Sequence, residues 1–321
     1  MADTTIRRTT MIVADAEGSR RFYEDVLGFR TYYDSKMKVT GKVIPIQPPN
    51  ATVQLYIMEP AHYPDAVEDN IGKIGILQWL DPALPPGRKP PGRLGIGDVV
   101  FVADCNDIHG LHKRVSNHPN ATVHCAPMDW SFPAPDGSGE LELTSMSFFD
   151  PDGFLHEVYY RNNRPNPDGY LIRRTTNIVR DMDAAIALYR DTLGLEIYQD
   201  GQMTLGGGME IPAGEPGAQM RLTVFKSNHD YIGMIGALQF IDPPLPEPDW
   251  DTWSMGIGRV VNVGGHSNVE GLYSGIERSG LQVTCPPLTR SVPASGGKTE
   301  IPMTTVGFFD PDGLLWEVNQ R

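Results

Sequence analysis

The sequence contains few of the features that mark disulfide-stabilised or membrane-spanning proteins. Its three cysteines, Cys105, Cys125 and Cys285, are an odd number without CxxC spacing, which indicates neither a disulfide framework nor a thiolate zinc site. No apolar run reaches the roughly 18 residues of a membrane span, and the opening MADTTIRRTT lacks the apolar core of a signal peptide. We therefore expect a cytoplasmic protein that makes no membrane contact.

Basic residues are also in deficit. The 27 Lys and Arg residues face 40 Asp and Glu residues, which gives a net charge of −13 at pH 7. Because binding to nucleic-acid phosphates depends on clustered cations, nucleic acid is not an expected partner. The 34 glycines and 28 prolines favour short strands and turns over long helices, and a length of 321 residues predicts about two domains.

The chain consists of two related halves. The sequence IRRTTMIVAD at residues 6–15 recurs as IRRTTNIVRD at 172–181, and FFDPDG at 148–153 recurs at 308–313. Between the copies lies NNRPNPDG, a polar segment rich in proline and asparagine that is typical of a linker. The sequence therefore predicts an N-terminal domain over 1–161, a linker over 162–169 and a C-terminal domain over 170–321.

Each half divides again at a proline-rich connector, within 81–92 and 242–249, which gives four modules. In the first module, residues 8–13 alternate as a strand, Asp15 is a candidate N-cap, and residues 17–27 have helical spacing up to Gly28. About three short strands follow each helix, the last one entered through a tight turn. We therefore predict an α+β fold of four βαβββ modules with cup-shaped mixed sheets.

Two motifs connect this pattern to a known family. The spacing Asp15…Phe22-Tyr23…Leu27-Gly28-Phe29, together with Asp150-Pro-Asp-Gly-Phe-Leu-His-Glu157, resembles the vicinal oxygen chelate superfamily, which includes glyoxalase I, extradiol dioxygenases and bleomycin resistance proteins. The resemblance covers nearly the whole chain. It implies paired modules that curve into a cup, where a metal is held by a histidine on the first strand and a glutamate on the last strand of each module. The fold itself does not specify one reaction.

The resemblance implies ligand positions that this sequence fills only in part. The first-strand position falls on non-histidine residues in all four modules: Arg8, Arg174, and either Gly97 with Gly258 or Asp98 with Arg259. The last-strand glutamate is retained as Glu157 and Glu317. Because a guanidinium group offers no lone pair to a cation, we expect no metal and no other cofactor.

In place of a metal site, the sequence predicts an arginine and a glutamate in each cup. We expect Arg8 to face Glu157 and Arg174 to face Glu317, and strand alternation to send Arg7 and Arg173 to the opposite face. The functional interpretation makes the glutamates proton acceptors and the arginines clamps for an oxyanion. The alternative is a buried ion pair left where a metal once sat.

Further residues are candidates for substrate binding. A glutamine within an apolar strand must either hydrogen-bond the backbone or reach a ligand, and aromatic residues are plentiful in the N-terminal half, which core packing would also explain. Equivalent inward positions carry Phe101 and Asn262, so the two cups are not expected to be alike. The predicted binding residues are Gln78, Tyr56, Phe101, Tyr159, Gln239 and Asn262. His156 aligns with Trp316, which favours a packing role.

The leading functional hypothesis is a metal-independent isomerase or lyase that acts on a small aromatic or carbonyl-bearing metabolite. The alternative from another class is a protein that binds hydrophobic small molecules without changing them, as bleomycin resistance proteins do. An extradiol-dioxygenase-like enzyme with unusual metal ligands is the weakest hypothesis. Because four modules can close two cups within one chain, the protein is expected to be a monomer or a homodimer.

Overall fold

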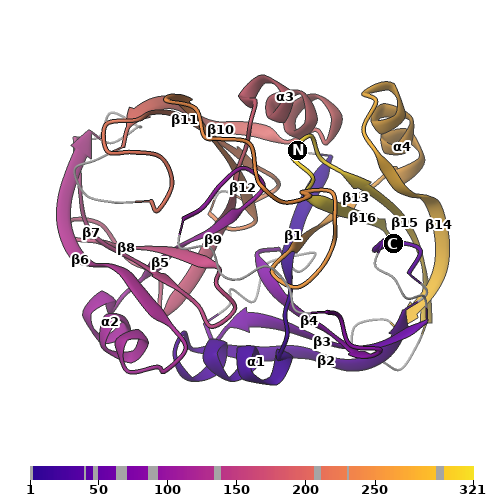
Figure 1. Ribbon diagram of the computed structural model, residues 1–321, viewed down its shortest axis with the longest axis horizontal. Helices are drawn as coiled ribbons and strands as arrows, with labels where there is room; N and C mark the ends of the chain where they lie inside the picture. The colour runs from indigo at the N-terminus through magenta and orange to yellow at the C-terminus, as the bar shows by residue number, and fades with distance from the viewer. Residues whose placement is uncertain are drawn as a thin grey trace.

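The computed structural model describes residues 3–39, 41–45, 50–62, 71–85, 93–133, 139–205, 211–229, 231–293 and 300–321. The chain forms four βαβββ modules, which confirms the predicted fold (Figure 1). The first module comprises β1 (Thr4–Ile12), α1 (Ala16–Asp25), β2 (Phe29–Val39), β3 (Ala51–Pro60) and β4 (Lys73–Asp81). The second comprises β5 (Val99–Cys105), α2 (Ile108–Ser116), β6 (Thr122–Pro133), β7 (Glu140–Phe149) and β8 (Leu155–Arg161).

The C-terminal half repeats this order. The third module comprises β9 (Tyr170–Ile178), α3 (Met182–Ile186) with a π-helical turn over Ala187–Thr192, β10 (Glu196–Thr204), β11 (Gln219–Lys226) and β12 (Met234–Asp242). The fourth comprises β13 (Val260–His266), α4 (Val269–Arg278), β14 (Val283–Pro293), β15 (Glu300–Phe309) and β16 (Leu315–Gln320). No helix in the described part of the chain is both long and apolar enough to cross a membrane.

Each of the two eight-stranded sheets joins one module from each half. The first and fourth modules form the order β14-β15-β16-β13-β1-β4-β3-β2, and the second and third form β10-β11-β12-β9-β5-β8-β7-β6. We call these the terminal sheet and the central sheet. Both sheets are strongly curled (Figure 1). Because each sheet contains one module from each half, its concave face, here also called its hollow, carries residues from both halves of the sequence.

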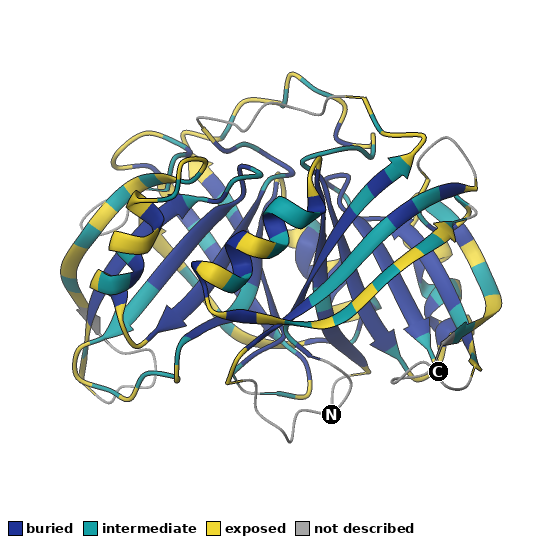
Figure 2. Ribbon diagram, turned by 90° about the horizontal axis from the view of Figure 1, so that it is seen from below, coloured by how far each residue is buried: buried dark blue, intermediate teal, exposed yellow. Residues whose placement is uncertain are grey.

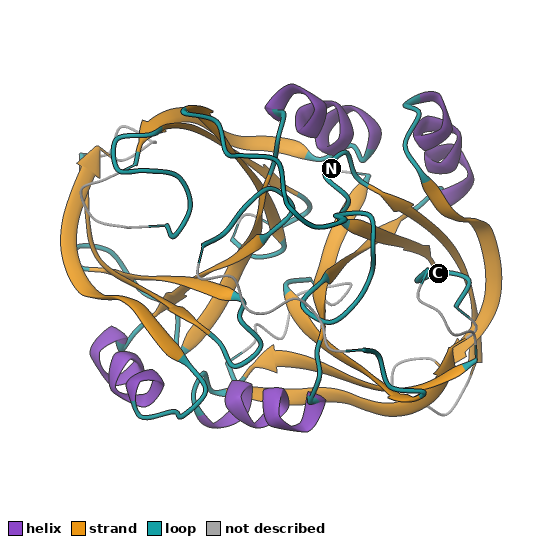
Figure 3. Cartoon of the chain, viewed as in Figure 1, coloured by secondary structure: helices purple, strands orange, loops and turns teal. Residues whose placement is uncertain are grey.

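The helices cover the convex faces of the sheets, where α1 lies beside α2 and α3 beside α4 (Figure 3). Phe22 and Tyr23 of α1 share one buried core with Leu111 and Val115 of α2, and α3 and α4 share a second core. Figure 2 shows the strands largely buried and the outer faces of the helices exposed. The modules of one half are thus joined through helices and the halves are joined through sheets, while the predicted boundaries at 1–161, 162–169 and 170–321 stay a prediction.

The helix starts follow the predicted capping chemistry. Asp15 accepts a hydrogen bond from the Gly18 amide, as an N-cap residue does. Gly28 has φ of 76°, a left-handed conformation that glycine adopts without a Cβ clash, directly after α1. This turn sends the chain back along the sheet into β2.

The two sheets meet back to back at β1 and β9. Thr9 and Thr175, which are equivalent residues of the duplicated sequence, lie with their hydroxyl oxygens 2.8 Å apart. The Thr9 hydroxyl also donates to Asn262 Oδ1 at 3.2 Å. Because alternate residues of a strand point to opposite faces, this contact directs Thr10 and Arg8 toward the hollow of the terminal sheet.

Candidate functional site on the concave faces

A β-bulge in β1 and another in β9 place two adjacent arginines on one side of each sheet. The pairing of β1 with β13 skips Arg7, and the pairing of β9 with β5 skips Arg173. An extra residue of this kind interrupts the strict alternation of side chains. The bulges therefore allow Arg7 and Arg173 to point toward the same face as Arg8 and Arg174.

Contacts confirm that both bulge residues reach the concave faces, so the prediction that they point the opposite way is wrong. Arg173 Nη1 lies 3.6 Å from Asp104 Oδ2. Asp104 is on the same face of β5 as Val102, which belongs to the buried hydrophobic cluster on the concave side of the central sheet. In the terminal sheet, a Cβ on Gly265 would lie 2.6 Å from Arg7 Nη2. Periodicity alone failed here because an inserted residue shifts the pattern by one.

The strand register places Arg8 and Arg174 each in line with one glutamate. Two rows cross the sheets, Arg8–Val263–Glu317 in the terminal sheet and Arg174–Val102–Glu157 in the central sheet. The arginine and glutamate of a row are two strand spacings apart, or about 10 Å between backbones. The predicted pairs were therefore wrong in their partners, because each sheet combines modules from different halves of the chain.

Arg8 and Arg174 are each held by a threonine two residues further along the same strand. Arg8 Nε donates to Thr10 Oγ1 at 3.1 Å, and Arg174 Nε donates to Thr176 Oγ1 at 3.1 Å. Within the described residues, the terminal guanidinium nitrogens of these arginines have no hydrogen-bond partner. Burial lowers the pKa of both arginines, while Glu317 and Glu157 respectively act to raise it. Each arginine thus offers unpaired N–H donors to the hollow.

Glu157 is a buried carboxylate with an aromatic neighbour. Its side chain is 7% exposed, and the Tyr159 hydroxyl donates to Glu157 Oε1 at 2.8 Å. Burial raises the pKa of the Glu157 carboxyl, and the charge of Arg174 and the Tyr159 hydrogen bond partly oppose that rise. Trp130 lies beside Tyr159, with ring centroids 6.3 Å apart, and its Nε1 donates to Ser145 Oγ at 2.9 Å. The central sheet therefore combines a carboxylate of raised pKa with an aromatic wall.

Glu317 has a different environment in the terminal sheet. Its Oε1 accepts from Arg290 Nη2 at 3.3 Å and from Asn319 Nδ2 at 3.2 Å. The Thr305 hydroxyl in turn donates to Asn319 Oδ1 at 2.5 Å. The two concave faces therefore share an arginine and a glutamate but differ in the residues around them.

The predicted glutamines serve the helix starts instead of the hollows. Gln78 Oε1 accepts from the Ala16 amide at 3.0 Å, and its Nε2 donates to the Ala14 carbonyl at 2.6 Å. Gln239 makes the equivalent pair of contacts with the Met182 amide and the Arg180 carbonyl. Both side chains thus lie on the convex face, and the prediction that they bind substrate in the cup is wrong. The backbone amides in the first turn of a helix have no intrahelical partner. The side-chain oxygens of Gln78 and Gln239 each accept a hydrogen bond from one of these amides.

Replacing Gln78 with alanine should destabilise the protein by about 1–2 kcal/mol, because it leaves the first amide of α1 and a neighbouring carbonyl without partners. The matched control is Gln54→Ala, since the Gln54 side chain donates to the exposed Asp34 side chain and not to a helix start, and it should cost less than about 0.5 kcal/mol. Urea unfolding of both variants measures the difference. Equal midpoints for the two variants would contradict this role.

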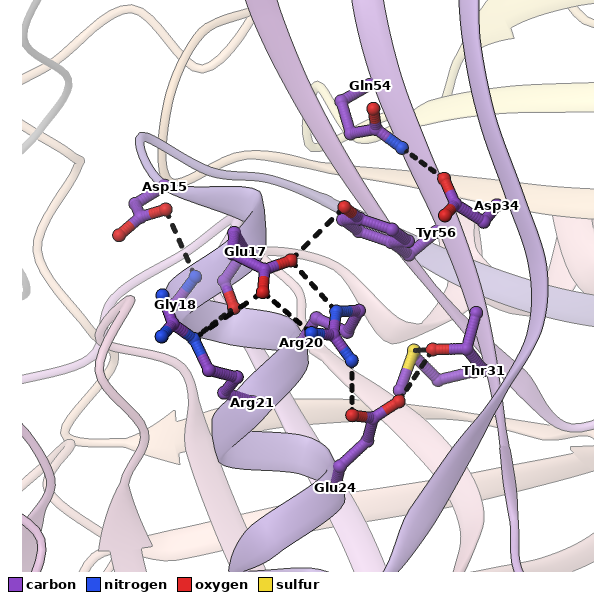
Figure 4. A network of polar contacts seen from close by, with 11 residues as sticks. Asp15, Glu17, Gly18, Arg20, Arg21, Glu24, Thr31, Asp34, Gln54 and Tyr56 are labelled. Carbon is purple, nitrogen blue, oxygen red and sulfur yellow. Dashed lines mark hydrogen bonds and ion pairs between the residues drawn. The ribbon is translucent and has the colours of Figure 1, made fainter.

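The remaining predicted binding residues lie away from the hollows, apart from Tyr159. The Tyr56 hydroxyl donates to Glu17 Oε2 at 3.2 Å, and Figure 4 shows the two side chains directed toward each other beside α1. Phe101 is fully buried in the core beneath the helices. Asn262 lies at the contact between the sheets. These residues lie off the concave face because they pack against helices or between the two sheets.

His156 lies in the same convex core, as its alignment with Trp316 suggested. Its ring stacks on Phe148 at 4.8 Å between centroids, and its Nδ1 lies 2.7 Å from the Tyr170 hydroxyl. An open groove of about 320 Å³ lies on this helical side as well, between Val26 and Leu111. None of the predicted site residues lines it.

The donor set on the concave faces does not fit the metal site that the family resemblance implies. Extending each row to the last strand of the other module gives Lys73–Arg8–Val263–Glu317 and Met234–Arg174–Val102–Glu157. The first-strand positions of the second and fourth modules are thus Val102 and Val263. This corrects both predicted registers, Gly97 with Gly258 and Asp98 with Arg259. One carboxylate beside an arginine cannot hold a divalent cation. Within the described ranges, no group of three or more His, Cys, Asp or Glu side chains is placed to bind a metal.

Comparisons with known proteins agree with this fold. Glyoxalase I from Zea mays is 14% identical with a TM-score of 0.60, over 99% of this chain and 92% of that chain. A putative dioxygenase from Bacillus subtilis is also 14% identical with a TM-score of 0.51, over 98% of this chain and 84% of that chain. No curated relative matches the sequence. At such identity these likenesses concern the fold and not the reaction.

The family assignment rests on the sequence match. The family model described as the Glyoxalase/Bleomycin resistance protein/Dioxygenase superfamily matches residues 5–158 and again residues 171–318. The two matches cover both halves of the duplication and leave residues 159–170, which include the polar segment, between them. The chain therefore belongs to the glyoxalase/bleomycin resistance protein/dioxygenase superfamily.

Proposed function

We propose that the protein is a metal-independent isomerase or lyase that acts on a small aromatic or carbonyl-bearing metabolite at the concave face of the central sheet. One observation carries this proposal. The buried Glu157 carboxylate stands in one row with Arg174, whose terminal nitrogens have no hydrogen-bond partner among the residues that the structure describes. Because both hollows form within one chain, the proposed chemistry requires no second subunit.

Glu157 would act as the proton acceptor. A carboxylate of raised pKa is a better base at neutral pH than a solvated one. It would take a proton from a carbon next to a substrate carbonyl, and the C–H electron pair would move toward the carbonyl oxygen. Arg174 would donate hydrogen bonds to the oxyanion that develops there. Return of the proton to another carbon gives an isomer, and loss of a leaving group from the neighbouring carbon gives a lyase product.

The aromatic wall supports an aromatic substrate. The indole N–H of Trp130 donates to Ser145, and its ring lies against the Tyr159 ring. Burial raises the pKa of the Tyr159 hydroxyl well above its usual value, so this group remains a hydrogen-bond donor to Glu157 at neutral pH. An aromatic ring packed against these side chains would lie beside Glu157, to which Tyr159 is hydrogen-bonded.

Deuterium exchange tests this proposal without knowledge of the final product. The protein is incubated in deuterated buffer with arylpyruvates, 2-hydroxy arylacetates and aryl β-keto acids, and NMR follows deuterium entering next to the carbonyl. Exchange of at least one class is expected, at a rate that dialysis against EDTA leaves unchanged. Loss of exchange after EDTA, with recovery on adding manganese or zinc, would contradict metal independence.

A binding role without catalysis is the second candidate, and one observation favours it. Met128 lies on the same strand as Trp130, two residues away, and is 41% exposed. An apolar rim beside an aromatic wall suits capture of a hydrophobic molecule. Calorimetry followed by mass spectrometry separates the two roles, because tight binding of an unchanged compound supports sequestration and conversion supports catalysis.

A further inference from the structure

We propose that the concave face of the terminal sheet is a second binding site, which takes a small molecule bearing a carboxylate or phosphate group. The site is centred on Arg8, Arg290 and Glu317. It stands independently of the reaction proposed for the central sheet, because it uses none of the same residues. Comparison of equivalent positions in the two hollows carries the argument.

The first difference is the loss of the aromatic wall. Arg290 pairs with Met303 across β14 and β15, as Trp130 pairs with Leu143 across β6 and β7. Asn319 pairs with Thr305, as Tyr159 pairs with Ser145. The two aromatic residues of the central sheet are therefore replaced by a cation and an amide at matching register. A surface that could stack on a ring becomes one that can grip an oxyanion.

The second difference is the loss of a counter-charge. In the central sheet, Asp104 is fully buried and forms an ion pair with Arg161 while Arg173 approaches it. Asp104 pairs with Tyr159, and the residue that pairs with Asn319 in the terminal sheet is Gly265. A carboxylate that neutralises arginines in one hollow thus has no counterpart at this position in the other.

The remaining charges leave the terminal hollow positive around Glu317. Arg290 reaches Glu317 Oε1, and Arg8 lies in the same strand row as Glu317. Arg290 and Arg321 are both close enough to lower the pKa of Arg8. Glu317 therefore faces several guanidinium groups, of which Arg8 keeps its terminal N–H donors without a protein partner within the described residues. Paired guanidinium forks recognise carboxylate and phosphate oxygens by two parallel hydrogen bonds.

Calorimetry with the full chain tests this site, with succinate and inorganic phosphate as probes at constant ionic strength. At least one probe is expected to bind at millimolar concentration. The variants Arg8→Gln and Arg290→Gln should each weaken binding about tenfold or more, which corresponds to about 1.4 kcal/mol. The control Arg190→Gln changes an exposed arginine that pairs with Asp191, and it should leave binding unchanged. Binding of only one probe identifies the anionic group.

Several outcomes would overturn the second site. They are no binding of either probe to the wild-type chain, equal binding to all variants, or an equal loss of binding in Arg190→Gln. Arg290 is 41% exposed along its side chain, so its substitution leaves the fold intact, and Arg290→Lys should recover part of the affinity through its charge. Failure of this test leaves the deuterium exchange assigned to Glu157 unaffected, because Arg8 and Arg290 lie on the other sheet.

Discussion

Glu157→Gln is expected to slow deuterium exchange about 10³-fold, because an amide cannot accept the substrate proton in the transition state. Glutamine keeps a carbonyl oxygen where Glu157 Oε1 receives the Tyr159 hydroxyl, so the local structure should survive. The matched control is Glu317→Gln, which changes the equivalent residue in the terminal sheet and should leave exchange unchanged. If neither variant altered turnover of the true substrate, a glutamate base would be ruled out.

The pH profile supplies a readout that a purely structural role of Glu157 would not give. Exchange should rise with pH through the raised pKa of Glu157, since only the deprotonated carboxylate is a base. Arg174 acts to lower that pKa. Removing its charge in Arg174→Gln should therefore move the rising limb of the profile to higher pH, in addition to reducing the rate about 10²-fold through loss of oxyanion stabilisation.

The module and helix pattern was predictable because it depends on local signals. Duplicated segments, a capping Asp15 and a glycine after the helix each specify structure within a few residues. The partners of Arg8 and Arg174 depend instead on which modules share a sheet, and four similar modules can pair in more than one way. The sequence carried no signal that distinguished these pairings.

Side-chain alternation alone mispredicted two details of the site. The bulges at Arg7 and Arg173 insert one residue each, so simple alternation assigns these arginines to the wrong face. Gln78 stands in an apolar strand for the sake of a helix start. The replacement of Trp130 by Arg290 can be found in the sequence alone, because counting back from the two FFDPDG motifs places these residues at equivalent positions.

The tight turns before the last strands also carry buried carboxyl groups, which bear on stability. Asp310 is 1% exposed, and its Oδ1 accepts from the amides of Asp312 and Leu314. Burial, with the nearby Asp312 charge, raises the pKa of Asp310 to about 7. Burial raises the pKa of Asp312 to about 6, against the opposing effect of Arg180. These aspartates hold protons in the folded state at pH values where the unfolded chain has released them.

Stability should consequently fall as pH rises from about 4 to about 8, with a contribution of about 4 kcal/mol from Asp310. A carboxyl whose folded pKa is raised favours the folded state below its unfolded pKa and loses that contribution as pH passes its folded pKa. Asp310→Asn should reduce the slope, because its amide oxygen can still accept the turn amides without ionising, while the raised pKa values of Asp312 and Asp152 keep part of the dependence. Urea unfolding between these pH values measures the slope.

The control for this effect is an aspartate whose pKa moves the other way. The hydrogen bond from Arg190 holds the pKa of the exposed Asp191 below its usual value, so its contribution is present above the unfolded pKa and is lost only in more acidic solution. Asp191→Asn should therefore leave the slope between neutral pH and pH 5 unchanged. An equal slope in wild type and Asp310→Asn would show that the buried turn is not the source of the pH dependence, and would locate it among the other acidic groups.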